Sequence, residues 1–184
     1  MVLLDYDIAP PPERSRYDVV GIDNFAAGLA IGRHLVRTGA KLIAFLHRPN
    51  AAPTVTSRMR GVAAAAVESG GKWSLKGNVL FAEPDNRRAV SKFLKNGLPD
   101  AFVAGNDVAA AALGETLARI GGGAEKIRLA GFDDVEVAAK LGLTTVRQPL
   151  DAIAEVAMQT LVSRIKTPDL PPRTILLDAE LVVR

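Results

Sequence analysis

Short apolar runs alternate with longer amphipathic segments along most of the chain, and this alternation predicts its fold. The runs are rich in Val, Ile, Leu and Ala, which is typical of strands buried on both faces. We expect strands at residues 2–4, 18–22, 42–46, 79–81, 101–104, 127–130, 144–146, 175–177 and 181–183. The segments between them predict helices at residues 25–38, 57–69, 84–95, 106–120 and 150–165.

Glycines and prolines supply the boundaries of these elements. Gly39 is expected to end the first helix, and Pro84 to open the third. Residues 9–16 and 47–56 contain several prolines and are predicted as loops. From residue 40 to residue 131 strands and helices alternate strictly, which predicts an α/β fold with a parallel sheet and helices on both faces.

The stretch Gly131-Phe132-Asp133-Asp134 directly follows a predicted strand. In open α/β sheets, ligands bind beyond the carboxyl ends of the strands. Other polar residues share this position, and a parallel sheet brings them to one edge: Asp5, Asp23, His47, Glu83, Asn106 and Asp107. Arg58, in the first turn of a predicted helix, lies at the same edge. Carboxylates, an amide and an arginine together suit a polyhydroxylated or zwitterionic small molecule.

Structural roles compete with these binding roles. Asn106 and Asp107 are both suited to cap the helix that follows them, and Asp23 can act as a cap or a hinge contact. Asp134 fits a solvated turn better than a ligand contact, whereas Asp133 fits the ligand better. Gly61, near the start of a predicted helix, indicates either close backbone packing or a nearby ligand.

Composition narrows the class of protein. The chain has 184 residues, is 48% hydrophobic and 23% charged, and carries a formal net charge of +3. Its basic residues are dispersed, which is not the pattern of a nucleic-acid footprint. It has no cysteine, no run that could span a membrane and no signal peptide, so we expect a cytoplasmic protein without membrane contact. No nucleophile motif or metal-ligand spacing is present, so we expect neither an enzyme nor a cofactor or metal protein.

Several motifs carry a resemblance to a known family. They are residues 20–24, Gly28, 34–35, 38–39 and 42–46, followed by residues 58–61, 99–107, 127–134, 143–149 and 181–184. In this order and spacing the chain resembles the effector-binding region of the lactose-repressor/galactose-repressor (LacI/GalR) family of bacterial transcription regulators. The resemblance implies a type I periplasmic-binding-protein-like fold with two Rossmann-like lobes, one complete here and the other partial.

The same resemblance implies a division of the chain and a ligand site. Residues 24–146 and 173–184 would form the C-terminal effector-binding lobe, and residues 1–22 and 149–170 part of the N-terminal lobe. The implied ligand-binding residues are Asp5, Arg58, Asn106, Asp133 and Gln148. The family's helix-turn-helix headpiece is not in this sequence, so DNA binding is expected only through such a headpiece. The aromatic residue that the family often places in the cleft would fall near Ala82, with Phe81 one position early.

The resemblance also implies partners. We expect a small-molecule effector, namely a sugar, a sugar phosphate or a nucleobase-like compound. We also expect a homodimer, with the helix bearing Leu113 and Leu117 and the segment 135–141 as candidate contact surfaces or, equally, as plain core. The alternative function is a solute-binding protein of a sugar importer, which would need an export signal.

Overall fold

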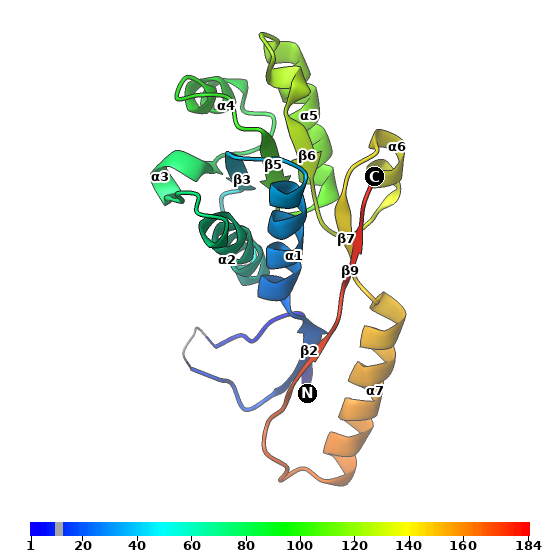
Figure 1. The fold of residues 1–184 in the computed structure, drawn as a ribbon. Helices are drawn as coiled ribbons and strands as arrows, with labels where there is room; N and C mark the ends of the chain where they lie inside the picture. Colours follow the sequence, from blue (N-terminus) through cyan, green and yellow to red (C-terminus); the bar gives the residue numbers. More distant parts are fainter. Residues whose placement is uncertain (10–12) are drawn as a thin grey trace. The chain divides into compact units, whose positions relative to one another are not determined.

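The structure, a computed structural model, describes residues 1–9 and 13–184 (Figure 1). Residues 10–12, which belong to the predicted proline-rich loop, lie outside the described residues. The chain divides into two compact units. Unit 1 comprises Met1–Asp23 and Gln148–Glu180, and unit 2 comprises Asn24–Arg147 and Leu181–Arg184.

Unit 2 is built on a four-stranded parallel sheet in the order β4-β3-β5-β6. Its strands are β3 (Ile43–His47), β4 (Val79–Phe81), β5 (Ala101–Ala104) and β6 (Arg128–Ala130). Its helices are α1 (Asn24–Arg37), α2 (Pro53–Glu68), α3 (Leu75–Asn78), α4 (Arg87–Leu94), α5 (Asp107–Ile120), the 3-10 helix η1 (Ala124–Lys126) and α6 (Glu136–Leu141). The expected parallel α/β fold is confirmed.

Alternate residues of the central strands serve opposite faces of this sheet. Leu46 and Phe102 are fully buried in one core cluster with Leu113 and Leu117 of α5. Phe45 and Val103 point to the other face and are equally buried. Both faces are therefore covered, which explains why the strand sequences are apolar without alternation.

Helices α1 and α2 approach each other at two glycines. A Cβ atom added to Gly28 would lie 2.0 Å from the carbonyl oxygen of Arg58, and one added to Gly61 would lie 2.1 Å from that of Phe25. Real Cβ atoms do not come this close to backbone, so both positions require glycine. Of the two explanations for Gly61, the structure supports close packing of helix against helix.

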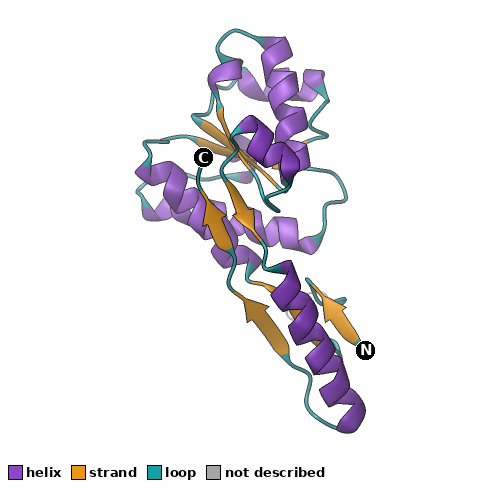
Figure 2. Cartoon of the chain, turned by 90° about the vertical axis from the view of Figure 1, so that its right-hand side faces the viewer, coloured by secondary structure: helices purple, strands orange, loops and turns teal. Residues whose placement is uncertain are grey.

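Unit 1 holds a three-stranded parallel sheet and one long helix (Figure 2). Its strands are β1 (Val2–Leu4), β2 (Asp18–Ile22) and β8 (Thr174–Leu177), in the order β1-β2-β8, and its helix is α7 (Leu150–Lys166). Strands β7 (Thr145–Arg147) and β9 (Glu180–Val182) form a separate two-stranded sheet.

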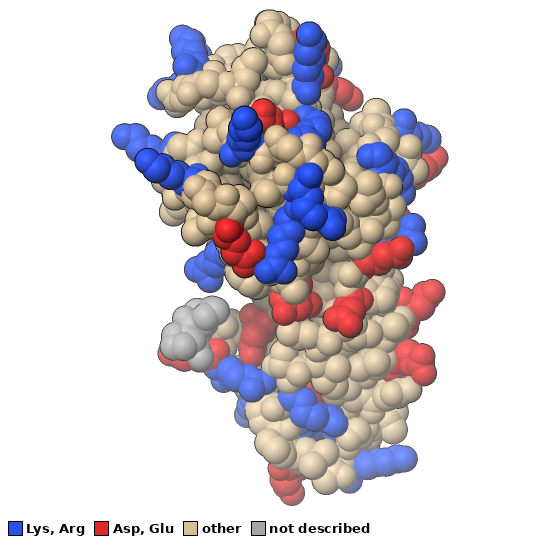
Figure 3. Space-filling model, viewed as in Figure 1, with Lys and Arg blue, Asp and Glu red and all other residues tan. Residues whose placement is uncertain are grey.

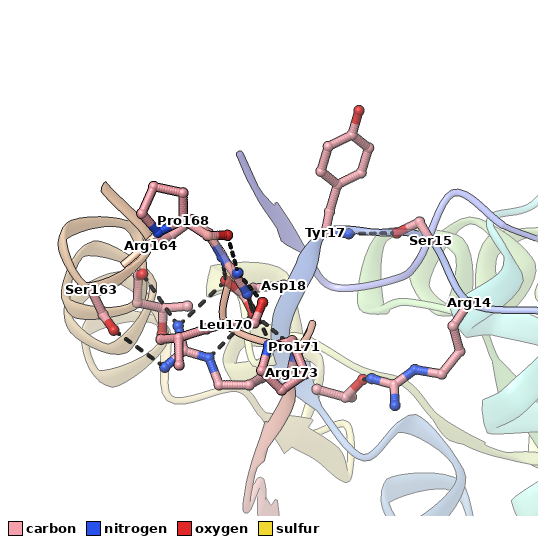
Figure 4. Close-up of polar contacts among 12 residues, drawn as sticks. Arg14, Ser15, Tyr17, Asp18, Ser163, Arg164, Pro168, Leu170, Pro171 and Arg173 are labelled. Atoms are coloured by element: carbon pink, nitrogen blue, oxygen red, sulfur yellow. Dashed lines mark hydrogen bonds and ion pairs between the residues drawn. The ribbon is translucent and has the colours of Figure 1, made fainter. Parts of the chain in front are cut away.

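A buried carboxylate holds unit 1 together (Figure 4). Asp18 is fully buried at the start of β2 and accepts hydrogen bonds from Arg164 at the end of α7 and from Arg173 just before β8. Arg164 also donates to the carbonyl oxygens of Pro168, Leu170 and Pro171. One carboxylate thus joins a strand, a helix end and a loop.

Two helix starts and one boundary between the units differ from those expected. Helix α2 begins at Pro53 instead of residue 57, because proline is favoured in the first turn. Helix α4 begins at Arg87 instead of Pro84, because the Asn86 side chain accepts the amide of Ala89 and sets the start there. Residues 173–180 belong to unit 1, whereas the resemblance placed them with the larger lobe, because β8 pairs with β2.

Candidate functional site

A pocket of about 520 Å³ lies at the carboxyl ends of β3, β4 and β5 in unit 2. Arg48, Asn50 and Ala52 line it from the loop after β3, Glu83 from the segment after β4, and Gly105 and Asn106 from the end of β5. This edge is where a parallel sheet collects ligand-binding groups. Of the predicted site residues, Asn106 lines the pocket directly.

Arg58 lies inside the fold beside this pocket, not on the surface. Arg58 as a whole is 4% exposed. Its side chain stacks on the Phe132 ring, with the guanidinium carbon 4.6 Å from the ring centroid. Its Nε donates to Asn24 Oδ1 at 2.8 Å, and its NH1 donates to the carbonyl oxygen of Gly105 at 2.7 Å. Arg58 is thus a buried cation held from three sides, and its expected ligand role stays a prediction.

Asp133 faces this arginine. Its Oδ1 is 3.8 Å from Arg58 NH1, and about a third of its side chain is exposed. Its backbone has φ 102° and its amide donates to the carbonyl oxygen of Val146. A non-glycine residue in this backbone region is rare and is held only by its surroundings. Arg58 and Asp133, predicted from positions 75 residues apart in sequence, are therefore brought together by the fold.

Asp107 holds the loop that carries Asp133. Its carboxylate accepts hydrogen bonds from the Thr145 hydroxyl at 2.7 Å and the Val135 amide at 3.1 Å, and its own amide donates to the carbonyl oxygen of Phe132. Burial raises the pKa of this fully buried carboxyl. The prediction that Asp107 caps its helix is wrong, because its side chain is used by the loop.

Asn106 is the residue that caps α5. Its Oδ1 accepts the amide of Ala109 at 2.8 Å, which satisfies one free donor of the first turn. The side chain also borders the pocket, so both roles considered for Asn106 are compatible with its position.

Asp134 has a structural role that the sequence did not indicate. Its carboxylate accepts a hydrogen bond from Arg184 at 2.6 Å and one from Arg147 at 2.7 Å. These two bonds hold the pKa of the carboxyl below its usual range, and the bond from Arg184 has the larger effect. The expected solvated turn is therefore wrong. Asp134 ties the end of β7 and the segment after β9 to the same loop.

Further side chains lie at the ends of β3 and β4, and the sequence assigned them no ligand role. Arg48 and Glu83 form an ion pair at 2.7 Å beside the pocket. His47 contacts the Thr56 hydroxyl at 3.1 Å, and its ring lies 5.3 Å from that of Phe81. Phe81 is more than half exposed, whereas Ala82 is buried. Phe81, the last residue of β4, is therefore the exposed aromatic at this strand end.

Asp5 and Gln148 belong to unit 1. Asp5 follows β1 with φ 73°, and its amide donates to the carbonyl oxygen of Val20. Gln148 is half-buried, and its carbonyl oxygen accepts the amide of Leu150 at the start of α7. Their expected ligand roles stay predictions.

Two further expectations concern surfaces. Leu113 and Leu117 are buried in the core of unit 2, so the alternative that they form core is correct, whereas Val135 and Leu141 are exposed.

On the face seen in Figure 3, Lys and Arg side chains are spread over many elements. Within residues 1–9 and 13–184, no three acidic or histidine side chains are grouped to hold a metal ion, and no helix is long and apolar enough to cross a membrane.

Comparison with known proteins identifies the family. Residues 33–184 match the model of the periplasmic binding protein-like domain. The chain belongs to this family. Over 194 aligned residues it is 28% identical to the HTH-type transcriptional repressor PurR of Aliivibrio fischeri, covering all of this chain and 56% of the repressor. The resemblance to the LacI family is confirmed: the chain corresponds to the effector-binding domain in the C-terminal half of such regulators.

Solved structures of transcription regulators show the same fold. The chain superposes with a TM-score of 0.83 on the transcriptional regulator CelR in complex with cellobiose, at 23% identity, covering all of this chain and 64% of that one. A LacI family regulator from Enterococcus faecium with bound ribose gives a TM-score of 0.79 at 21% identity, covering all of this chain and 66% of that one. The relatives named here are transcription regulators and not enzymes.

Proposed function

We propose that this domain senses a sugar-like effector for a transcription regulator, and that Arg58 and Asp133 contact the effector. The observation that carries the proposal is the buried Arg58 cation, 3.8 Å from the partly exposed Asp133 carboxylate, which follows β6 at the same edge of the sheet as the pocket. A donor and an acceptor side by side can bind adjacent hydroxyls, each of which both donates and accepts.

The site favours a neutral polyhydroxylated ligand over an anion. Asp133 and Glu83 contribute negative charge at this edge of the sheet, and Arg58 and Arg48 each already face a carboxylate. An added anion would meet this charge without a free cation. That solved relatives hold cellobiose and ribose supports the same ligand class.

Thermal unfolding with added ligands tests the proposal. The probes are cellobiose and ribose as neutral sugars, ribose 5-phosphate as a sugar phosphate, and adenine as a nucleobase. A ligand at 100 times its Kd stabilises the folded protein by about 2.7 kcal/mol. We expect a neutral sugar to raise the unfolding temperature, and stabilisation by adenine alone would contradict the proposed ligand class.

Two variants locate the site. Asp133→Asn keeps the shape and tolerates positive φ, but it removes the charge that faces Arg58. We expect it to abolish ligand stabilisation without unfolding the protein. Arg60→Ala, an exposed arginine on the same helix as Arg58, is the matched control and should respond to ligand like the original protein. Retained stabilisation in Asp133→Asn would refute the role of this residue. Asp5→Ala and Gln148→Ala test the two predicted residues of unit 1 in the same assay.

A further inference from the structure

Three neighbours set the orientation of the Arg58 guanidinium. Asn24 Oδ1 accepts a hydrogen bond from its Nε at 2.8 Å, and the carbonyl oxygen of Gly105 accepts one from its NH1 at 2.7 Å. The guanidinium also lies over the Phe132 ring. Because a guanidinium is a rigid plane, two hydrogen bonds on different nitrogens and one stacked ring fix both its position and its tilt. Of these three contacts, the one from Asn24 is made by a polar side chain.

Helix α1 brings Asn24 to Arg58. Asn24 is the first residue of α1 and Gly28 stands four positions later, so both lie on the same face of the helix. Gly28 packs against the backbone of Arg58, where an added Cβ would lie 2.0 Å from the carbonyl oxygen. Figure 1 shows α1 and α2 side by side. One face of α1 therefore contacts Arg58 twice, at its backbone through Gly28 and at its side chain through Asn24.

Burial makes the hydrogen bond from Arg58 to Asn24 hard to replace. Asn24 is 7% exposed and Arg58 is 4% exposed, so water has little access to the Nε–H group. A buried donor that loses its acceptor either stays unsatisfied or turns toward another acceptor. Asp133 Oδ1, 3.8 Å from Arg58 NH1, is such an acceptor, and this separation is longer than a hydrogen bond. Loss of the Asn24 contact would therefore let Arg58 close onto Asp133.

We propose that Asn24 is a positioning residue of the effector site. By holding Nε of Arg58, its amide oxygen keeps the guanidinium apart from the Asp133 carboxylate, so that both remain available to the effector. A sugar hydroxyl, which donates and accepts, fits between such a donor and such an acceptor. Asn24 itself does not touch the effector. The inference rests on the proposed function, because it requires Arg58 and Asp133 to contact the effector.

The Nε–H group of Arg58 reports the hydrogen bond in the absence of any sugar. Its signal in a nitrogen–proton NMR spectrum, assigned through the Phe132 ring, should exchange slowly with water because the donor is buried and bonded. In Asn24→Ala we expect this exchange to be at least about tenfold faster. Asn78→Ala is the matched control, since Asn78 is 6% exposed in the same unit and its side chain donates to Ile43 instead. It should leave the Arg58 signal unchanged.

Isothermal titration calorimetry with cellobiose and with ribose measures the consequence for binding. For each of the two sugars that the original protein binds, we expect Asn24→Ala to raise the Kd about tenfold, because one orienting hydrogen bond is lost. Asn78→Ala also loses a buried hydrogen bond and some stability, but its Kd should be unchanged. Circular dichroism verifies that each variant is folded.

Two further variants at the same position complete the experiment. Asn24→Asp retains an acceptor oxygen at the same reach, and it should restore slow exchange and return the Kd to within about threefold of the original value. If Asn24→Ala does not fold, Asn24→Ser takes its place. Serine also favours helix starts, but its oxygen stands one bond closer to the backbone and so leaves Arg58 without this acceptor.

The outcomes separate the positioning role from the proposed function. Faster exchange together with a raised Kd in Asn24→Ala, both reversed in Asn24→Asp, would support the inference. An unchanged Arg58 signal, or an unchanged Kd for a sugar that binds, would overturn it and leave the proposed function standing. An equal rise of the Kd in Asn78→Ala would also overturn it, because general destabilisation would then explain the effect. If the original protein binds neither sugar, the proposed function fails and the inference fails with it.

Discussion

Arg164 and Asp18 form a two-point ion pair inside unit 1, with Nε 3.0 Å from Oδ2 and NH2 2.9 Å from Oδ1. The two residues are 146 positions apart in the sequence. The carboxylate is fully buried, and the hydrogen bonds from Arg164 and then Arg173 hold the pKa of Asp18 far below its usual range. Because breaking a buried pair leaves an uncompensated charge, this carboxylate is expected to be essential for unit 1.

Asp18→Ala should lower the free energy of unfolding by about 3 kcal/mol, at the lower end of the range for buried pairs because Arg173 is partly exposed. Urea unfolding followed by circular dichroism measures this loss. Asp85→Ala, which removes an exposed carboxylate before α4, is the control and should stay within about 0.5 kcal/mol of the original protein. Equal stability of the two variants would contradict a structural role for Asp18.

The low pKa of Asp18 predicts a pH dependence of stability. Its contribution is complete above the unfolded-state pKa of about 4 and is lost as pH falls below it, because the unfolded chain then binds a proton that the folded carboxylate does not. Between pH 6 and pH 3 this amounts to about 1 kcal/mol. Asp18→Asn should lack this part of the acid destabilisation. Asp107, whose pKa burial raises, contributes with the opposite sign, so the comparison is made at Asp18 alone.

The close contact of α1 with α2 gives a third prediction. Gly61→Ala places a Cβ atom 2.1 Å from the carbonyl oxygen of Phe25, so the helices must separate. We expect a loss of about 3 kcal/mol, as for other severe overpacking. The control is Gly114→Ala in α5, where the new atom meets only the flexible end of Leu129. Alanine is the better helix former there, by up to about 1 kcal/mol, so thermal unfolding should show little loss.

The strands and the rim of the site could be predicted because they depend on local sequence. Each apolar run ends at a polar residue, and parallel topology alone brings Arg58 and Asp133 to the same edge of the sheet. The role of Gly61 was reduced to two possibilities, and only the structure, which places Phe25 against it, could choose between them.

Contacts between distant segments could not be predicted from periodicity. Strand β8 pairs with β2, and Arg173 just before β8 donates to Asp18, 155 positions away. This pairing places residues 173–180 in unit 1. Asp134 was interpreted as a turn residue because its partner Arg184 lies 50 positions away. In both cases an acidic residue accepts a hydrogen bond from an arginine far away in the sequence, and the local sequence does not indicate this contact.

Asp107 and Thr145 provide the last prediction, which separates support of the site from binding itself. Thr145→Val keeps the side-chain shape but removes the hydroxyl that donates to the buried Asp107 carboxylate at 2.7 Å. Removing the donor of a hydrogen bond to a buried charged group lowers the free energy of unfolding by about 1.5 to 3 kcal/mol. We expect this loss in urea unfolding, with about 0.5 kcal/mol or less for the exposed Thr167→Val.

Ligand binding by Thr145→Val tests whether the loop of Asp133 needs this bond. Because Asp107 also accepts the Val135 amide, its carboxylate keeps this hydrogen bond to the loop, and we expect weaker effector binding instead of none. A double-mutant cycle with Asp107→Asn measures the coupling of the pair, expected at about 1 kcal/mol or more. Additive effects of the two substitutions would show that the hydroxyl and the carboxylate act independently, and that Asp107 supports the loop through Val135 alone.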